Sequence, residues 1–297
     1  MYKNLSPDAL GVSGWQSELI ELALTYGFKS FDIDIAELLK ANASQGQEYA
    51  CRFIASAKVQ VGTFDLPLRL QSDVEKFKAG LVALDETASL AAAADATRCI
   101  THVDAASDDL PYHENFELHR TRLGEIADVL GKHGVQLGIG FHAAASHRAD
   151  KQFQFIYEAE PLVTLIKTIG NEHVGLVLDT WDWQVGGGTT DQLEDLAANQ
   201  IVTARLADVP EDADSATIEE RQRLLIGENE TGNSAAVLRL LAEKEYTGPV
   251  SVYPHPSQFG RGTRESIVQK ASRALDEQWT AAGLDRSGKV APVVAEA

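Results

Sequence analysis

Two carboxylates and two indole rings follow one strand of this sequence in close succession. Residues 174–178 form a continuous apolar run, which predicts a strand buried on both faces, and Asp179 ends it. Trp181, Asp182 and Trp183 come directly after, ahead of a glycine triplet that suits a loop hinge. Enzymes with parallel sheets place reactive groups on such loops, at the carboxyl ends of the strands. A carboxylate in this position needs a partner, so we expect a polar site here.

Other reactive side chains lie at or near the ends of further predicted strands. Arg205 lies within one strand, and Tyr253 ends the last one. His142 ends a third, and His255 lies two residues after Tyr253. Histidines in such places are more often hydrogen-bonded loop residues than metal ligands unless several converge. Because parallel strands end at one edge of a sheet, we expect these side chains to meet there.

Helices and strands alternate eight times along the chain. This regular alternation requires a parallel sheet, and eight strands close it with an interior that side chains just fill. We therefore predict a single-domain α/β fold, a (β/α)8 TIM barrel over residues 1–284. The predicted strands are 10–13, 28–35, 59–66, 98–103, 135–142, 174–178, 201–207 and 250–253. The predicted helices are 17–26, 47–58, 72–94, 113–134, 158–170, 192–198, 234–246 and 264–282.

The main competing architecture is an open, doubly wound sheet. Such a sheet usually carries a glycine-rich nucleotide loop after its first strand, but residues 11–16 have the spacing of neither a dinucleotide fingerprint nor a P-loop. The final residues, 285–297, show no periodicity and are expected to be a disordered tail.

The charge and composition exclude several classes of protein. A net charge of −18 repels phosphate backbones, so we expect no nucleic-acid partner. The N-terminus lacks a signal-like apolar segment and no apolar run is long enough to cross a bilayer, which predicts a cytoplasmic protein without a membrane partner. Two cysteines form no disulfide or metal pattern. The sequence does not fix the oligomeric state and is compatible with a homodimer.

Six segments of the chain carry a likeness to known proteins: 134–139, 174–183, 186–189, 202–210, 227–232 and 248–254. Together they resemble the xylose-isomerase-like TIM barrels, the sugar phosphate isomerase/epimerase superfamily. Weaker likeness extends back to residue 10, so the resemblance covers nearly all of the chain except the tail. Active members of this family hold a divalent metal at the barrel mouth through Glu, Asp, His and Glu on the fifth to eighth strands, and the glutamates also move a proton.

The resemblance implies that this metal site is largely lost. The four ligand positions correspond to Gly140, Asp179, Arg205 and Tyr253, so only the aspartate is retained. The family often has a histidine three residues after that aspartate, where this chain has Asp182. We hypothesise that Arg205 replaces the charge of the metal through a salt bridge to Asp179, that Tyr253 fills the rest of the cavity, and that no metal cofactor is used.

The resemblance therefore implies a sugar (phosphate) isomerase/epimerase-like protein that binds a small polyhydroxylated ligand. It either catalyses a metal-free proton transfer or binds without turnover. The expected catalytic residues are Asp179, Arg205 and Tyr253. The expected ligand-binding residues are His142, Trp181, Asp182, Trp183, Glu228 and His255. The tryptophans would stack on a sugar ring, although a core position is an equal alternative.

The sequence is compatible with two further interpretations. The first is an active isomerase or epimerase that depends on Mn or Mg, with a displaced metal site in which His142 and His255 join Asp179 and Asp182. The second is an abasic-site endonuclease. It is disfavoured because it would need a zinc cluster rich in histidine and a basic face, whereas the chain has eight histidines and an acidic balance.

Overall fold

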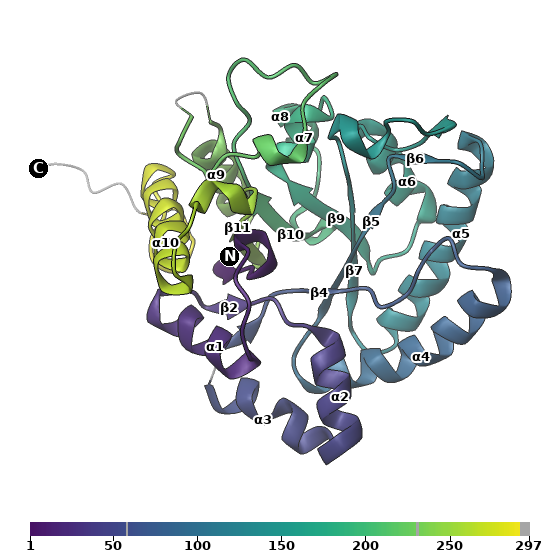
Figure 1. Ribbon diagram of the computed structural model, residues 1–297, viewed down its shortest axis with the longest axis horizontal. Coiled ribbons are helices and arrows are strands. Elements are labelled where there is room, and N and C mark those ends of the chain that lie inside the picture. The colour runs from purple at the N-terminus through teal and green to yellow at the C-terminus, as the bar shows by residue number, and fades with distance from the viewer. Residues whose placement is uncertain (58, 230–231, 292–297) are drawn as a thin grey trace, which may run out of the picture.

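A computed structural model describes residues 1–57, 59–229 and 232–291 (Figure 1). Its main sheet is built from nine segments: β1 (Tyr2–Leu5), β2 (Ser30–Phe31), β3 (Gln60–Val61), β4 (Phe64–Asp65), β5 (Arg98–Val103), β7 (Gln136–Phe141), β9 (Val174–Asp179), β10 (Ile201–Leu206) and β11 (Pro249–Val252). They pair in the order β3-β2-β1-β11-β10-β9-β7-β5-β4, and every pairing is parallel.

The two edge segments, β3 and β4, are parts of one strand. Only Gly62 and Thr63 separate them in the chain. β3 pairs with β2 and β4 pairs with β5, so the third strand joins the two ends of the sheet. The sheet therefore closes on itself with eight strand positions, and the predicted α/β barrel is confirmed.

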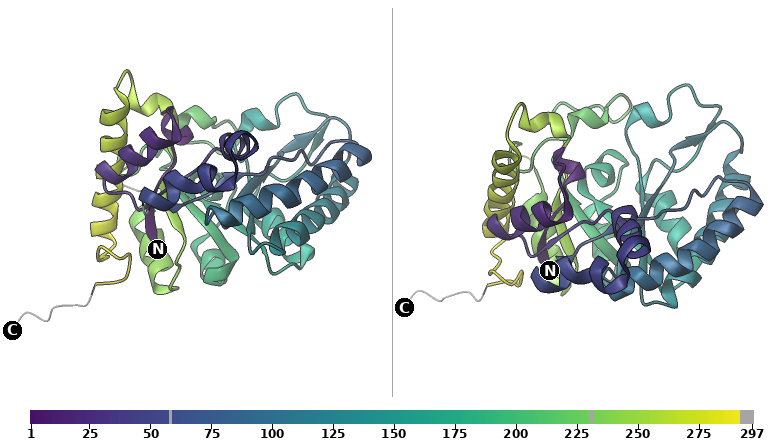
Figure 2. Two further views of the ribbon diagram at one scale, coloured as in Figure 1. Left: turned by 90° about the horizontal axis from the view of Figure 1, so that it is seen from below. Right: turned by 60° about the horizontal axis from the view of Figure 1, so that its bottom comes forward.

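Helices surround the sheet, as the ribbon views show (Figures 1 and 2). The helices are α1 (Gln16–Thr25), α2 (Ile35–Gln45), α3 (Gln47–Ala57), α4 (Val74–Ala93), α5 (Tyr112–Gly131), α6 (Ala159–Ile169), α7 (Thr180–Val185), α8 (Thr190–Glu194), α9 (Ser234–Glu243) and α10 (Arg264–Ala281). The last of them, α10, packs beside α1, so the first and last helices of the barrel are neighbours in space.

Shorter elements decorate the loops. β6 (Ala106–Ser107) and β8 (Phe153–Gln154) form a small antiparallel ribbon apart from the barrel. Single 3₁₀ turns are η1 (Asp8–Leu10), η2 (Ala145–His147), η3 (Ala198–Gln200), η4 (Glu220–Gln222) and η5 (Pro256–Phe259). η2, η4 and η5 lie after β7, β10 and β11, at the carboxyl-terminal end of the barrel.

The core fills the barrel and the space between sheet and helices. All six residues of β9 are buried, as expected for a strand covered on both faces. In α5 the fully buried Leu123, Ile126 and Leu130 recur at helical spacing. Burial of each such side chain contributes roughly 1.5–3 kcal/mol, so the inward stripe holds the helix on the sheet.

The first strand begins earlier than the sequence pattern indicates. Residues 10–13, predicted as a strand, are not one: Leu10 is the last residue of η1, Gly11 caps that turn with a φ of 65°, and residues 12 and 13 lie in the loop after it. The true first strand is β1, whose Asn4 points into a polar layer of the barrel. The predicted strand 28–35 is also shortened to β2, because the side chain of Asp34 accepts a hydrogen bond from the amide of Ala36 and starts the unpredicted helix α2.

The C-terminal segment after α10 is folded back as far as residue 291. Trp279 Nε1 donates to the carbonyl of Asp285 at 2.8 Å, and Leu284 forms an antiparallel bridge with Val290. The remainder of the predicted disordered tail, 292–297, lies outside the described residues. Among the described helices, none combines the length and the apolar character that crossing a bilayer requires.

Candidate functional site

A cavity of about 750 Å³ opens at the carboxyl-terminal end of the barrel. Loops that follow several strands form its wall, which is the usual place for the site of a TIM barrel. The cavity brings together six of the residues singled out from the sequence: His142, Asp179, Asp182, Arg205, Tyr253 and His255.

Asp179 is held by two different kinds of donor. As the N-cap of α7, its carboxylate accepts hydrogen bonds from the amides of Trp181 and Asp182, at 3.0 and 3.1 Å. Nη1 of Arg223 also donates to both of its oxygens, at 2.9 and 2.8 Å. The partner that the sequence required for this carboxylate is therefore Arg223.

Arg223 also binds Asp182, through Nη2. Its side chain and those of the two aspartates are almost fully buried, and the ring of Trp181 lies 4.5 Å from the guanidinium carbon. Burial opposes the charged form, but the two carboxylates outweigh it and raise the pKa of Arg223. Burial raises the pKa of Asp182, against the opposing effect of Arg223. The three groups form a closed, buried ion cluster.

The hypothesis of a salt bridge between Arg205 and Asp179 is wrong. The two residues are neighbours in the register of β10 and β9, but Asp179 turns toward α7 and Arg223. Nη1 of Arg205 instead lies 3.2 Å from Nε2 of His102, and its guanidinium carbon lies 4.2 Å from the centre of the Tyr253 ring. Among the described residues, Arg205 contacts no carboxylate within ion-pair distance, although it is buried.

His102 occupies the space that a side chain at residue 140 would need. A Cβ on Gly140 would lie 2.6 Å from Cδ2 and 2.8 Å from Nε2 of that imidazole. Burial, followed by the charge of Arg205, lowers the pKa of His102 well below its ordinary value. His102 is therefore neutral, and its Nε2 accepts a hydrogen bond from Arg205.

The two tryptophans do not line the cavity, so the core alternative is the one that the structure supports. The chain leaves the extended conformation at Thr180 and enters α7, which removes the expected common orientation with Asp179. Trp181 is fully buried against Arg223. Trp183 packs in the main core, and its Nε1 donates to the carbonyl of Thr189 at 3.1 Å.

Glu228 and His255 were both expected to bind the ligand, but only His255 lines the cavity. Glu228 is not part of the cavity lining and pairs with Lys270 at 2.9 Å. His255 does line it, and its Nδ1 contacts Oγ of Ser257 at 2.8 Å.

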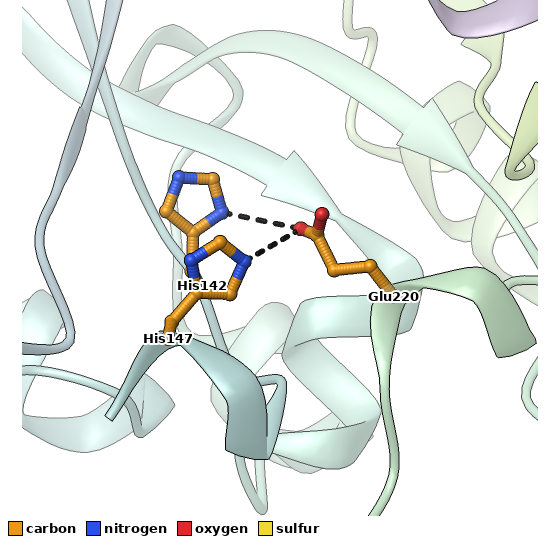
Figure 3. A group of neighbouring side chains, drawn as sticks. All are labelled: His142, His147 and Glu220. Carbon is orange, nitrogen blue, oxygen red and sulfur yellow. Dashed lines mark ion pairs between the residues drawn. The ribbon is translucent and has the colours of Figure 1, made fainter. Parts of the chain in front are cut away.

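A second polar cluster lies at the rim, formed by His142, His147 and Glu220 (Figure 3). Nδ1 of His142 and Nε2 of His147 lie 3.6 and 3.1 Å from the same oxygen, Oε1 of Glu220. The imidazoles of His142 and His147 are stacked with their centres 4.3 Å apart, and His102 stacks on the other face of His142 at 4.9 Å. The imidazole of His142, followed by that of His147, lowers the pKa of Glu220 below its ordinary value.

The sequence reasoning missed Arg223, His147 and Glu220. Each lies in a loop segment outside the predicted helices and strands, so no hydrophobic period marks it. The only available signal was the unpaired Asp179, which required a cation without indicating which one.

Carboxylates at or after the ends of the first three barrel strands also line the cavity wall. Asp32 accepts hydrogen bonds from the amide and the hydroxyl of Thr63, each at 2.8 Å. Desolvation at the cavity wall raises the pKa of Asp65, partly offset by the nearby charge of Arg205, although the side chain is exposed to the cavity. Desolvation also raises the pKa of Asp8, which is exposed as well. This wall is therefore rich in acceptors for hydroxyl groups.

Residues 20–278 match the family described as the xylose isomerase-like TIM barrel. The chain belongs to this family. No curated protein matches the chain in sequence. The fold is shared by solved sugar isomerases and epimerases and by a solved AP endonuclease from Brucella melitensis.

Three solved structures illustrate the likeness. A xylose isomerase domain protein from Alicyclobacillus acidocaldarius is 22% identical, with a TM-score of 0.83 over 95% of this chain and 99% of its own. An IOLI protein with a bound zinc atom is 15% identical, with a TM-score of 0.77 over 95% and 98%. The D-psicose 3-epimerase of Clostridium cellulolyticum H10, solved with D-tagatose, is 13% identical, with a TM-score of 0.72 over 95% and 99%.

The residues at the family's metal position do not fit a metal ion. Gly140 offers no donor, and the carboxylate of Asp179 is already bound by Arg223. Arg205 brings a positive charge that repels a cation. Burial raises the pKa of Tyr253, so its phenol stays protonated at neutral pH.

Proposed function

We propose that this protein binds a small polyhydroxylated ligand, in the manner of a sugar isomerase or epimerase, without a metal at the family's position. One observation carries the proposal: Arg223 binds both oxygens of Asp179, the one ligand of that position which the chain retains. A fixed guanidinium charge thus stands in for an exchangeable ion. The cavity itself remains large enough for a sugar.

The charges around the cavity favour a neutral ligand over a sugar phosphate. Carboxylates outnumber guanidinium groups in its wall, and one of the two guanidinium groups, on Arg223, is already neutralised. These carboxylates would repel a phosphate but would accept hydrogen bonds from sugar hydroxyls. The acidic residues concerned are Asp8, Asp32, Asp34, Glu37, Asp65, Asp179, Asp182 and Glu220.

Arg205 supplies the chemistry that a metal would otherwise provide. Its buried charge has only neutral contacts among the described residues, His102 and the ring of Tyr253, and it lines the cavity. Such a cation stabilises the negative charge that develops on a sugar carbonyl oxygen when a proton leaves the adjacent carbon. Asp65, whose pKa is raised, is the proposed acceptor of that proton, and protonated Tyr253 is a proton donor.

A ligand panel tests this proposal. Calorimetry in the presence of a chelator would compare D-fructose, D-tagatose, D-psicose and D-fructose 6-phosphate. We expect at least one neutral ketose to bind, and to bind more tightly than the phosphate. Incubation in heavy water then tests turnover, because proton transfer would place deuterium on the carbon next to the carbonyl. Binding that requires added metal, or a preference for the phosphate, would contradict the proposal.

The alternative is a metal-dependent isomerase or epimerase with displaced ligands, as a Mn or Mg enzyme would need. One observation favours it: the convergence of His142, His147 and Glu220 beside the cavity. The other candidates for a displaced site do not support it, since Asp179 and Asp182 are bound by Arg223. Turnover abolished by chelation would favour this alternative. We propose no nucleic-acid partner in either case, because the chain carries a net charge of −18.

A further inference from the structure

Three side chains with metal-binding atoms converge at the rim of the cavity (Figure 3). The donor atoms of His142, His147 and Glu220 all lie within 4.8 Å of one another. We propose that this triad binds one divalent transition-metal ion, at a site separate from the family's metal position. None of the four residues at that position, Gly140 among them, belongs to the triad.

The donor set and its spacing suit a first-row transition metal. Two imidazole nitrogens and one carboxylate oxygen favour zinc, cobalt or iron(II) over magnesium or calcium, which prefer oxygen ligands. Bonds of about 2.0–2.1 Å place the ligands of a tetrahedral ion roughly 3.3 Å apart. The distances from Oε1 of Glu220 to His147 and His142, 3.1 and 3.6 Å, lie on either side of that value.

Two of the donor atoms lack a hydrogen-bond partner. Nδ1 of His142 and Nε2 of His147 are buried, and neither makes a hydrogen bond among the described residues. Their contacts with Glu220 have ion-pair distance but not hydrogen-bond geometry. Unsatisfied buried nitrogens are costly, and two that approach one carboxylate oxygen would both be satisfied by a cation placed among them.

The backbone around the triad holds these ligands in place. The amide of Ala145 donates to the carbonyl of Ile218 at 2.9 Å, which ties the loop after β7 to the segment that carries Glu220. Nη1 of Arg148 donates to the carbonyl of Ala143 at 2.7 Å within the first of these loops. Three residues after Glu220, Arg223 anchors the second segment through its buried ion cluster. The triad therefore joins two loops whose positions are fixed by other contacts.

A metal ion bound by the triad would lie next to the cavity. Both His142 and Glu220 line the cavity wall. Three protein ligands leave coordination positions for water or for an oxygen of a bound ligand. The inference is independent of the proposed function, since sugar binding is measured with the metal removed.

Metal titration of the full chain tests the triad directly. Protein freed of metal by a chelator and then desalted would be titrated with Zn²⁺ against a chromophoric competitor, and with Co²⁺ by visible absorption. We expect one equivalent to bind. His147→Ala and Glu220→Gln should each weaken zinc binding at least as much as loss of an outer-shell partner does, which is about 10- to 100-fold. His255→Ala, which removes another imidazole at the same mouth, is the matched control and should leave zinc affinity unchanged.

Two results of the titration would overturn the inference. One is wild-type protein that binds zinc no more tightly than Glu220→Gln, and the other is an equal loss in His255→Ala. If a triad variant fails to fold, ¹⁵N NMR of the wild-type imidazoles decides the question. Zinc should shift Nδ1 of His142 and Nε2 of His147 but not the resonances of His255, and unchanged triad resonances would exclude the site. Neither result changes the outcome of the ketose panel, so the two proposals fail separately.

Discussion

Two arginines at the barrel mouth share burial and an aromatic neighbour but differ in their partners. Arg205 and Arg223 are each 5% exposed, and their guanidinium carbons lie 4.2 and 5.8 Å from the ring of Tyr253. Arg223 is held by two carboxylates, whereas Arg205 contacts neutral His102. The charge of Arg223 is therefore neutralised within the protein, whereas the charge of Arg205 is available to a ligand.

The difference arises from where each arginine lies in the chain. Arg205 is on β10, directly beside Asp179 in the sheet register, but that carboxylate turns away to cap α7. Arg223 follows η4 in a loop that lines the cavity, and its backbone carbonyl accepts a hydrogen bond from the amide of His255 at 3.2 Å. Adjacent positions in a sheet therefore do not guarantee paired side chains, because a cap can redirect one of them.

The largest effect is expected on breaking the buried ion cluster. Arg223→Met leaves two buried carboxylates without a counter-charge and should reduce the free energy of unfolding by about 3–5 kcal/mol. Urea denaturation measures this. Arg205→Met is the matched control and should cost less: about 0.5–1.5 kcal/mol for one neutral-acceptor hydrogen bond and about 0.5–2 kcal/mol for the cation–π contact with Tyr253.

A second pair of variants checks the electrostatic origin of that loss. Adding Asp182→Asn to Arg223→Met removes one of the uncompensated charges, so part of the lost stability should return. Equal losses of stability in Arg223→Met and Arg205→Met, or no recovery in the double variant, would contradict the proposed difference between the two arginines.

Arg205 should matter more for ligand binding than it does for stability. A hydrogen bond to a charged group contributes about 1.5–3 kcal/mol, so Arg205→Met should weaken the tightest-binding ketose of the panel roughly 10- to 100-fold. Arg205→Lys keeps the charge and should retain part of the affinity. Calorimetry on variants that remain folded provides the measurement. An unchanged dissociation constant in Arg205→Met would show that its charge does not face the ligand.

Local patterns were enough to predict most of the fold. The buried run of β9 and its terminal Asp179 are found as expected, because a strand covered on both faces needs only neighbouring apolar residues to be recognised. β1 was missed for the opposite reason. Its Asn4 is buried and bonds to Asp32 and Ser251, at 2.9 and 2.8 Å, partners that lie far away in sequence.

The site was predictable only in part, because some of its contacts join residues that lie far apart in the sequence. The residues that end strands, such as Asp179 and Tyr253, could be placed at the mouth from the fold alone. The partner of Asp179 lies 44 residues away in a loop without periodicity, so its identity depended on tertiary structure. Trp181 and Trp183 were misplaced because the helix that follows Asp179 was not anticipated.

The packing of His102 beside Gly140 gives a smaller, local effect. A Cβ there would lie 2.6–2.8 Å from the imidazole, so Gly140→Ala should cost about 1–3 kcal/mol by overpacking and displace His102 from Arg205. Gly124→Ala is the control, because a Cβ in the middle of α5 would meet only Ile169, at 3.9 Å. It should stabilise the protein by roughly 0.5–1 kcal/mol through helix propensity. A Gly140→Ala protein as stable as wild type would show that His102 moves freely.

The smallest effect concerns the ring that both arginines share. Tyr253→Phe keeps the aromatic face, whereas Tyr253→Leu removes it and should lose a cation–π contribution of about 0.5–2 kcal/mol. Because the ring is closer to Arg205 than to Arg223, double-mutant cycles should give the larger coupling energy with Arg205→Met. Urea denaturation of the single and double variants supplies the four free energies of each cycle. Equal coupling to both arginines would mean that Tyr253 does not distinguish the two charges, and only the carboxylates would then separate their roles.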